Sequence, residues 1–397
     1  MPIALSSCPS PLAHQPSTLT YGQLTEGLGY DPASQVTQIL HQLTATSATI
    51  NQAAYAYNSV GNRTSLTDRR GSQAFGYDNL DRLTSASHPL LATPQGFAYD
   101  AVGNRTTGGS VVNAGNQLTA DATHSYQYDD NGNLTRKTLL ATGNFTQYTY
   151  DAENRLTKVE EFTAGNPTPA FTSTYRYDGL GRRIEKVANG QTKRYIYDGE
   201  DILLEYDGTN ALQARYTHGP GIDEPIAVTK GGSTFFYHQD GLGTVTDLTD
   251  STGAPAKSYS YDAYGTIMDQ TGTVEQPYTY TGREFDSETE LYYYRVRYYD
   301  SSTGRFLQQD PGSAGINSAR DKKRGRESFL DETVSGLIQE PPCPVDRASL
   351  LEILPIMYST AESVDSRCLT SLLIMPCLRR FWPRPTRRRG FALPPIV

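Results

Sequence analysis

Apolar and polar residues alternate along short segments of the chain, and each segment ends in a Tyr. Residues 125–128 read Ser-Tyr-Gln-Tyr, 147–150 Gln-Tyr-Thr-Tyr, 174–177 Thr-Tyr-Arg-Tyr and 258–261 Ser-Tyr-Ser-Tyr. A period of two in residues such as Tyr and Thr is typical of a β-strand with one face buried. The alternation therefore predicts a series of strands that end at these tyrosines.

A turn is predicted directly after each strand, because Asp follows the Tyr and Gly follows soon after. Asp side chains accept hydrogen bonds from the backbone ahead of them, and Gly adopts a positive φ without strain. A second strand follows, as at 134–137 and 156–159, so each unit is interpreted as a β-hairpin with Asp at its hinge. The predicted hinge pairs are Tyr99 and Asp100, Tyr128 and Asp129, Tyr150 and Asp151, Tyr177 and Asp178, Tyr197 and Asp198, and Tyr261 and Asp262.

The hinges recur at a nearly fixed spacing, which indicates stacked repeats. About a dozen units of about 21 residues cover positions 21–311, with Tyr216-Thr217, Tyr237-His238 and Tyr280-Thr281 placed in the remaining slots. Tyr supplies 28 side chains against 12 Phe and one Trp, and hydrophobic residues are only 37% of the chain. We therefore expect an all-β fold, a long coiled antiparallel sheet with a wet interior, forming a cocoon or partial shell.

Several ordered motifs near residue 300 resemble the end of the RHS-associated core. They are Tyr280-Thr281-Gly282-Arg283-Glu284, the run from Glu290 to Asp300, Thr303-Gly304-Arg305-Phe306-Leu307 and Asp310-Pro311. Upstream, 237–244 and 261–265 resemble the family's YH-D-LGS and YDAYG elements. The resemblance to RHS/YD-repeat proteins, which include bacterial polymorphic toxins and toxin-complex C subunits, covers about 290 residues. It implies a β-strand cocoon that shields a C-terminal effector.

The resemblance divides the chain into four segments. They are an irregular leader at 1–20, YD repeats at 21–236, the RHS-associated core at 237–311 and a variable tail at 312–397. From residue 313 the chain holds 13 Lys and Arg against nine acidic residues, nine of the 23 Pro, and one Tyr. That composition predicts a poorly ordered or degenerate tail.

In many members of the family, an aspartyl-protease site at the end of the core frees the effector. Matching the motif offers Asp300 and Asp310 as the carboxylate pair, with Arg297 as a charge partner. Two close carboxylates that share a proton can act as acid and base on water. The residues after Asp310 depart from the pattern of self-cleaving members, and both Asp residues could instead open turns.

Other candidate chemistry is weaker. His238 and Asp240 could form a base with its orienting acid, but we interpret them as residues of a repeat hinge, because no nucleophile element accompanies them. The four Cys lack metal-ligand spacing, and neither a cofactor nor a metal site is predicted. No segment is long and apolar enough to span a bilayer.

Three functional classes stay open. The favoured one is a structural shell segment of an RHS-family toxin that encloses and delivers an effector or its remnant. The second is a cell-surface carbohydrate-binding or adhesion module. The third is an enzyme, either the Asp300 and Asp310 protease or a nucleic-acid-targeting tail. The first implies a secretion-apparatus or B-type toxin partner, an immunity protein and a secreted or cell-surface location, reached by a route that the sequence does not show.

Overall fold

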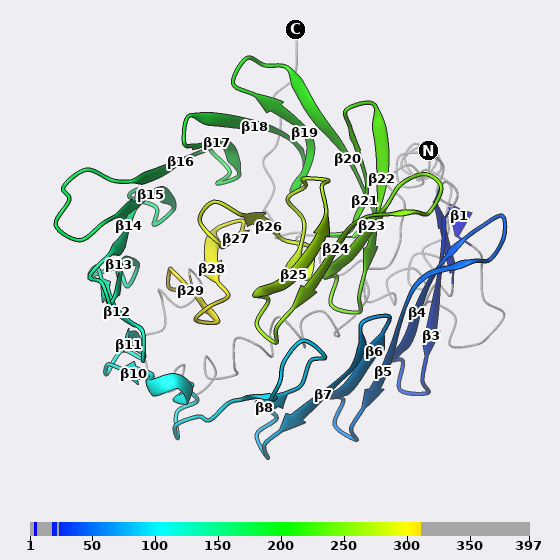
Figure 1. Cartoon of the computed structure of the whole chain (residues 1–397), viewed down its shortest axis with the longest axis horizontal. Helices are drawn as coiled ribbons and strands as arrows, with labels where there is room; N and C mark the ends of the chain where they lie inside the picture. The colour runs from blue at the N-terminus through cyan, green and yellow to red at the C-terminus, as the bar shows by residue number, and fades with distance from the viewer. Residues whose placement is uncertain (1–3, 6–17, 22–23, 222, 311–397) are drawn as a thin grey trace, which may run out of the picture. The chain divides into compact units, whose positions relative to one another are not determined.

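The strands of the chain form three antiparallel sheets. The computed structural model describes residues 4–5, 18–21, 24–221 and 223–310. Within them lie a nine-stranded, a sixteen-stranded and a four-stranded sheet, in which neighbours in sequence are neighbours in the sheet (Figure 1). The prediction of an all-β fold built from long antiparallel sheets is confirmed. The expectation for residues 312–397 lies outside the described residues.

The element bounds follow the hairpin repeat. The nine-stranded sheet consists of β1 (Ala4–Leu5), β2 (Thr18–Tyr21), β3 (Leu24–Tyr30), β4 (Val36–Leu43), β5 (Thr49–Tyr57), β6 (Arg63–Asp68), β7 (Gly71–Tyr77), β8 (Leu83–Ala86) and β9 (Gln95–Gly96). The sixteen-stranded sheet consists of β10 (Val111–Val112), β11 (Leu118–Ala120), β12 (His124–Tyr128), β13 (Leu134–Leu139), β14 (Phe145–Tyr150), β15 (Leu156–Phe162), β16 (Phe171–Tyr177), β17 (Arg183–Ala188), β18 (Gln191–Asp198), β19 (Asp201–Asp207), β20 (Leu212–His218), β21 (Pro225–Lys230), β22 (Ser233–Gln239), β23 (Val245–Thr249), β24 (Pro255–Tyr261) and β25 (Ile267–Gly272). The four-stranded sheet consists of β26 (Glu284–Asp286), β27 (Leu291–Tyr294), β28 (Arg297–Asp300) and β29 (Arg305–Phe306). Two short 3₁₀ segments, η1 (Thr107–Gly109) and η2 (Tyr280–Gly282), complete the described elements.

Most predicted hinge acids open the turn between two strands. The Oδ1 atom of Asp178 accepts hydrogen bonds from the backbone N–H groups of Leu180 and Arg182, both at 2.9 Å. Gly181 has φ +83°, a conformation in which a side chain would be strained. Asp100, Asp129, Asp151 and Asp262 accept equivalent backbone hydrogen bonds. At these five positions the carboxylate fixes the turn, as the composition of the hinge predicts.

The hinge tyrosines join each repeat to the one before it. The hydroxyl of Tyr150 donates a hydrogen bond to the carbonyl oxygen of Leu134, the first residue of β13, at 2.8 Å. The same bond recurs from Tyr57 to Val36, Tyr77 to Arg63, Tyr99 to Leu83, Tyr128 to Leu118, Tyr177 to Leu156, Tyr197 to Arg183 and Tyr261 to Val245. Phe could not make this bond, so the hydroxyl explains why the repeat carries Tyr.

A second polar link joins each hinge to the next. Arg182 binds its own hinge carboxylate, Asp178, through Nε at 2.8 Å, and its Nη1 reaches the carbonyl oxygen of Gly199 at 2.6 Å. Asn133 likewise binds Asp129 through Nδ2 and reaches the side chain of Asn154 at 2.8 Å. Tyr and Arg or Asn therefore hold each hinge to its two neighbours, and stability is spread over many repeats.

At one predicted hinge the carboxylate does not fix the turn, and two other hinge assignments were wrong. Asp198 lies within β18 opposite Asp201, where it belongs to the ladder and no side-chain hydrogen bond from it is found in the described part of the chain. The hinge assigned to Tyr237-His238 is formed by Gln239 and Asp240, because Asp240 Oδ1 accepts the N–H groups that follow it. The hinge assigned to Tyr280-Thr281 lies two residues earlier, where the N–H of Gly282 binds the carbonyl of Thr279. Counting residues between tyrosines missed these positions, because the loops differ in length.

Removing one hinge hydroxyl is expected to cost a measurable part of the stability. Tyr150→Phe leaves the carbonyl oxygen of Leu134 without its partner, and we expect the free energy of unfolding to fall by about 1 kcal/mol. Tyr206→Phe is the matched control, because within the described residues the Tyr206 hydroxyl forms no hydrogen bond, and it should change stability by less than about 0.5 kcal/mol. Urea unfolding followed by tyrosine fluorescence measures both. Equal values for the two variants would contradict the role given to the hinge hydroxyl.

Candidate functional site

The four-stranded sheet packs tyrosines on both of its faces. Tyr293 and Tyr298 lie opposite each other in β27 and β28, and their rings are 5.3 Å apart. Tyr292 and Tyr299 form the neighbouring pair, so their side chains point to the other face. There the Tyr292 hydroxyl donates to the carbonyl oxygen of Gly265 at 2.6 Å. The motif with consecutive tyrosines therefore forms a sheet that is buried from two sides.

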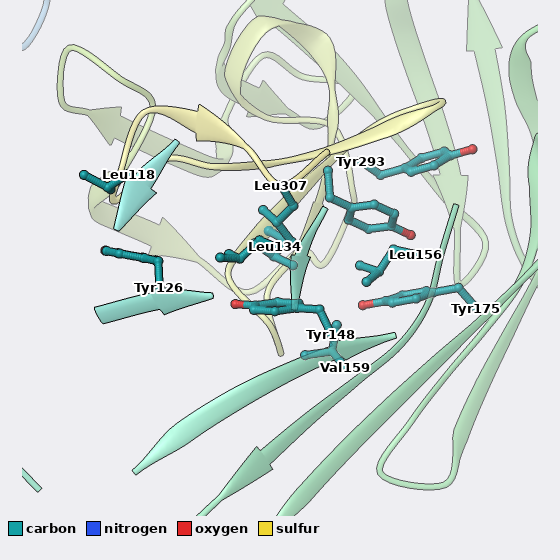
Figure 2. Close-up of a cluster of buried hydrophobic side chains, with 11 residues drawn as sticks. Leu118, Tyr126, Leu134, Tyr148, Leu156, Val159, Tyr175, Tyr293 and Leu307 are labelled. Atoms are coloured by element: carbon teal, nitrogen blue, oxygen red, sulfur yellow. The ribbon is translucent and has the colours of Figure 1, made fainter. Parts of the chain in front are cut away.

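One of these faces packs on the sixteen-stranded sheet. Figure 2 shows Tyr293 of β27, and Leu307, which follows β29, against side chains of β11 to β16. The cluster of buried residues consists of Leu118, Tyr126, Leu134, Tyr148, Leu156, Val159, Tyr175, Leu291, Tyr293, Tyr298 and Leu307. Ring contacts therefore join the repeats to the four-stranded sheet, as at Tyr175 and Tyr298, 5.2 Å apart, and this interior is apolar rather than wet.

A buried ion cluster fixes the same sheet to β17. Arg183 is 1% exposed and binds Asp286 through Nη1 and Glu284 through Nη2, the latter at 2.9 Å. Lys186 binds Asp286 at 2.7 Å and Glu288 at 2.6 Å. The guanidinium carbon of Arg183 lies over the ring of Tyr293 at 4.5 Å, and the backbone N–H of Arg183 donates a hydrogen bond to the hydroxyl of the same Tyr293 at 3.0 Å. Charges, rings and hydrogen bonds converge on Arg183.

The two acids that bind Arg183 respond differently to their burial. Burial raises the pKa of Asp286, but Arg183 and Lys186 outweigh that effect and hold it below its usual range. Burial dominates at Glu284 and raises its pKa. The favourable contribution of Asp286 is therefore present above the pKa of the unfolded chain and is lost as the pH falls through its lowered value. At neutral pH, Asp286 is the ionised partner of the two cations.

The two carboxylates that the family motif offers as a catalytic pair each have a cation as partner. Asp300 lies at the end of β28 opposite Arg305, and its carboxylate binds Lys137 at 2.8 Å and the N–H of Ser302 at 2.9 Å. Asp310 pairs with Arg297, the predicted charge partner, at 3.4 Å. Asp300 therefore opens a turn and pairs with Lys137, and catalysis by the two carboxylates stays a prediction.

The purified full chain is accordingly expected to keep its full-length mass. Asp300→Asn and Asp310→Asn should leave that mass unchanged over days at neutral and mildly acidic pH, since Lys137 and Arg297 already pair with the two carboxylates. Intact-mass spectrometry of the three proteins checks the expectation. A cleavage product in the unmodified chain that either Asn variant abolishes would restore the protease hypothesis.

The sequence predicted that His238 belongs to a repeat hinge, and this prediction was wrong. It lies in β22 with no exposed surface and its Nε2 contacts the hydroxyl of Thr249 at 2.8 Å. No group of His, Cys, Asp and Glu suited to a metal ion occurs among the described residues. Within that same part of the chain, no helix has the length and apolar character that a membrane crossing requires.

Comparison with known proteins identifies the fold. The sequence profile of the teneurin YD-shell matches residues 17–324, well over half of the chain. The chain belongs to the teneurin YD-shell family. The family assignment agrees with the RHS/YD-repeat resemblance of the sequence motifs, and the hinge bonds above show how this YD-shell sequence builds its sheets.

Individual relatives of this YD-shell chain include toxins. It is 30% identical over 349 residues to double-stranded DNA deaminase toxin A of Burkholderia cenocepacia, covering 77% of this chain and 24% of that protein. It is 30% identical over 296 residues to the probable deoxyribonuclease RhsB of Dickeya dadantii, covering 66% and 19%. The crystal structure of TcdB2-TccC3 superposes with a TM-score of 0.53 at 19% identity, over 77% of this chain and 18% of that one. The chain thus spans a quarter or less of each of these proteins.

Proposed function

We propose that this chain is the C-terminal part of an RHS-type toxin shell that encloses and delivers a C-terminal effector or its remnant. The observation that carries the proposal is the four-stranded sheet, which directly precedes residue 311 and is fixed to β17 by the buried Arg183 cluster. In this proposal, the four-stranded sheet would fix the point at which the C-terminal segment, residues 312–397, leaves the shell. Residues 21–236 would be the repeats, 237–311 the core and 312–397 the cargo.

Partners and location follow from the same proposal. A shell that carries a toxic segment needs a delivery partner, either a secretion apparatus or a B-type toxin component, and the producing cell needs an immunity protein. The protein would then act outside the cell that makes it. A nucleic-acid-targeting tail is the cargo class that relatives such as the deaminase toxin favour, although that hypothesis concerns residues outside the described part of the chain.

The thiols of the C-terminal segment, residues 312–397, test the enclosure directly. Cys343, Cys368 and Cys377 lie in this segment. The experiment uses a Cys8→Ser background, which removes the fourth thiol of the chain. A polymer-linked maleimide, too large to enter a folded shell, should modify these thiols much more slowly in the native protein than in denaturant. Arg183→Met, which unlocks the four-stranded sheet, should raise the native rate. Native labelling as fast as in denaturant would overturn the proposal.

A second candidate, carbohydrate binding, rests on a cavity of about 410 Å³ between β3–β8 and β23–β24. Its walls include Tyr57, Tyr77 and Tyr261, and the guanidinium of Arg63 lies there over the rings of Tyr55 and Phe75 at 5.7 and 4.8 Å. Rings beside charged hydrogen-bonding groups suit the apolar face and hydroxyls of a sugar.

A glycan array probed with the full chain tests this candidate. Arg63→Ala should abolish any signal that depends on the cavity. Arg136→Ala is the matched control, because Arg136 also stacks on a ring, that of Phe145, and does not line the cavity. An array without signal, or equal signals from both variants, would remove the candidate.

A further inference from the structure

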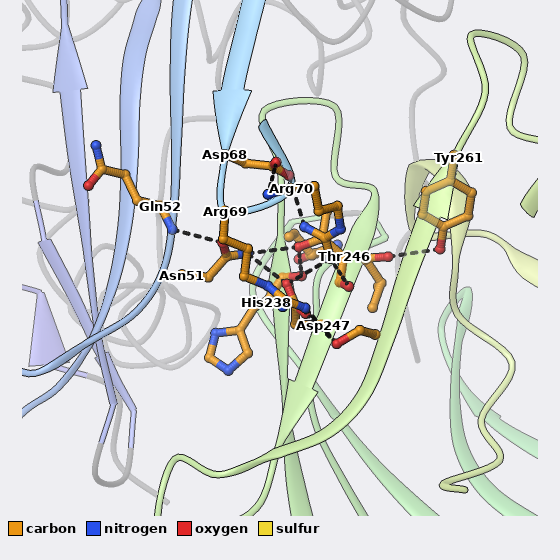
Figure 3. Close-up of polar contacts among 12 residues, drawn as sticks. Asn51, Gln52, Asp68, Arg69, Arg70, His238, Thr246, Asp247 and Tyr261 are labelled. Atoms are coloured by element: carbon orange, nitrogen blue, oxygen red, sulfur yellow. Dashed lines mark hydrogen bonds and ion pairs between the residues drawn. The ribbon is translucent and has the colours of Figure 1, made fainter. Parts of the chain in front are cut away.

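The nine-stranded and sixteen-stranded sheets meet at a seam that joins residues almost 200 positions apart. The seam is defined by His41, Asn51, Arg69 and Arg70 on one side and His238 and Asp247 on the other. The carboxylate of Asp247 binds Asn51 at 2.8 Å and Arg70 at 3.1 Å, and it also pairs with Arg69 (Figure 3). Apolar side chains, among them Leu24 and Phe236, pack beside it. The seam is therefore a packed contact between two sheets.

Two buried imidazoles face each other across this seam. The rings of His41 and His238 are 4.7 Å apart and nearly perpendicular, and the side chains are 3% and 0% exposed. His41 Nε2 contacts the carbonyl oxygen of Gln239 at 3.2 Å, so one of its nitrogens already spans the seam. A positive charge on either ring would lie against the other ring with no water to solvate it.

The carboxylates near His238 are already paired with other groups, so a protonated His238 ring would have no carboxylate free to bind it. Asp247, its cross-strand neighbour, is already bound by Arg69, Arg70, Asn51 and Ser258. Asp68 is paired with Arg70. Glu26 is the cross-strand neighbour of His41 in β3 and β4. Burial, His41 and Arg69 together hold the pKa of His238 well below its usual range.

We propose that the seam is an acid-sensitive closure, in which protonation at the facing imidazoles parts the nine-stranded sheet from the sixteen-stranded sheet and loosens the strands that form the seam. In the open state the His238 ring is hydrated and regains an ordinary pKa of about 6.5. Below that pH the open state binds a proton that the closed state excludes. The ratio of open to closed protein then rises up to about tenfold per pH unit through His238.

Opening would also uncover the cavity described above, because Arg70 and Thr246 belong to the seam region and line that cavity. The device would therefore couple acidity to access to the space between the two sheets. This inference does not depend on the nature of the enclosed segment, since it concerns only the contact between the two sheets.

Hydrogen exchange of the full chain at about pH 7.5 and about pH 5.5, corrected for the intrinsic rates, tests the proposal. Protection of β4, β5, β22 and β23 should fall at least about tenfold on acidification, whereas β12 to β15 should keep theirs. His238→Gln removes the titrating ring and should abolish most of this response, and His41→Gln, which removes the ring that His238 faces, should weaken it. His124→Gln, in β12 and away from the seam, should retain it.

Two results would overturn the inference. One is an equal loss of protection in β12 to β15 in the unmodified chain, which would indicate general acid unfolding. The other is an unchanged response in a folded Gln variant. Because the two histidines are substituted separately, failure of one variant to fold leaves the other as the decisive measurement.

Discussion

Arg183→Met is expected to lower the free energy of unfolding by about 3–5 kcal/mol. The substitution keeps a long apolar side chain but leaves Asp286 and Glu284 buried with only Lys186 to compensate their charges. It also removes the cation that lies over the Tyr293 ring. Chemical denaturation measures the loss, and hydrogen exchange at residues 284–306 shows whether the four-stranded sheet is the part that detaches.

Arg182→Met is the matched control for that experiment. Arg182 is the preceding residue, and its guanidinium binds the hinge carboxylate of Asp178 with a side chain that is 24% exposed. A partly solvated pair of this kind contributes about 0.5–1 kcal/mol. The account therefore expects a several-fold difference between adjacent arginines, and equal losses from the two variants would show that the buried cluster has no special role.

Tyr298→Ala is expected to cost about 3–5 kcal/mol, whereas Tyr298→Phe should cost about 1 kcal/mol. The ring lies between Tyr175 and Tyr293, at 5.2 and 5.3 Å, and is 1% exposed, so its removal leaves a cavity where the two sheets join. The hydroxyl contributes less, through contacts of 3.2 Å with Arg183 and Tyr177.

The two substitutions at Tyr298 separate the contribution of ring packing to the free energy of unfolding from the contribution of the hydroxyl's hydrogen bonds. Tyr206→Ala serves as the control, because Tyr206 is a half-buried residue of β19 outside this cluster and should cost about 1 kcal/mol. Urea unfolding of the four proteins gives the comparison. If Tyr298→Phe cost as much as Tyr298→Ala, the hydroxyl and not the ring would hold the four-stranded sheet.

Much of the repeat architecture was predictable, because hinge chemistry is local. An Asp that accepts the N–H groups ahead of it and a Gly with positive φ act within five residues, so Asp178 and Gly181 could be placed from the sequence alone. The same reasoning failed at Asp198, where the turn is only two residues long and the Asp stays in the ladder. Loop length, which the sequence pattern describes poorly, decides between the two cases.

The buried cluster was not predictable from the alternation of apolar and polar residues. β17 buries Arg183 and exposes Ile184, the reverse of what hydrophobic patterning favours. A register shift between Arg176 and Tyr177 skips Ile184 and accompanies that inversion, and the partner Asp286 lies about 100 residues away. The only available signal was a pair of acids in Glu284-Phe285-Asp286 within the family motif. Likewise, the contact between His238 and His41 depends on how two sheets meet, which no local pattern encodes.

Trypsin digestion of the native full chain, followed by mass spectrometry, tests most directly whether the C-terminal segment is enclosed. Residues 313–397 contain 13 Lys and Arg, so an accessible segment would be cut at once. We expect the native chain to keep this segment intact and Arg183→Met to lose it rapidly. Removal of the segment from the native chain at the rate seen in Arg183→Met would contradict enclosure.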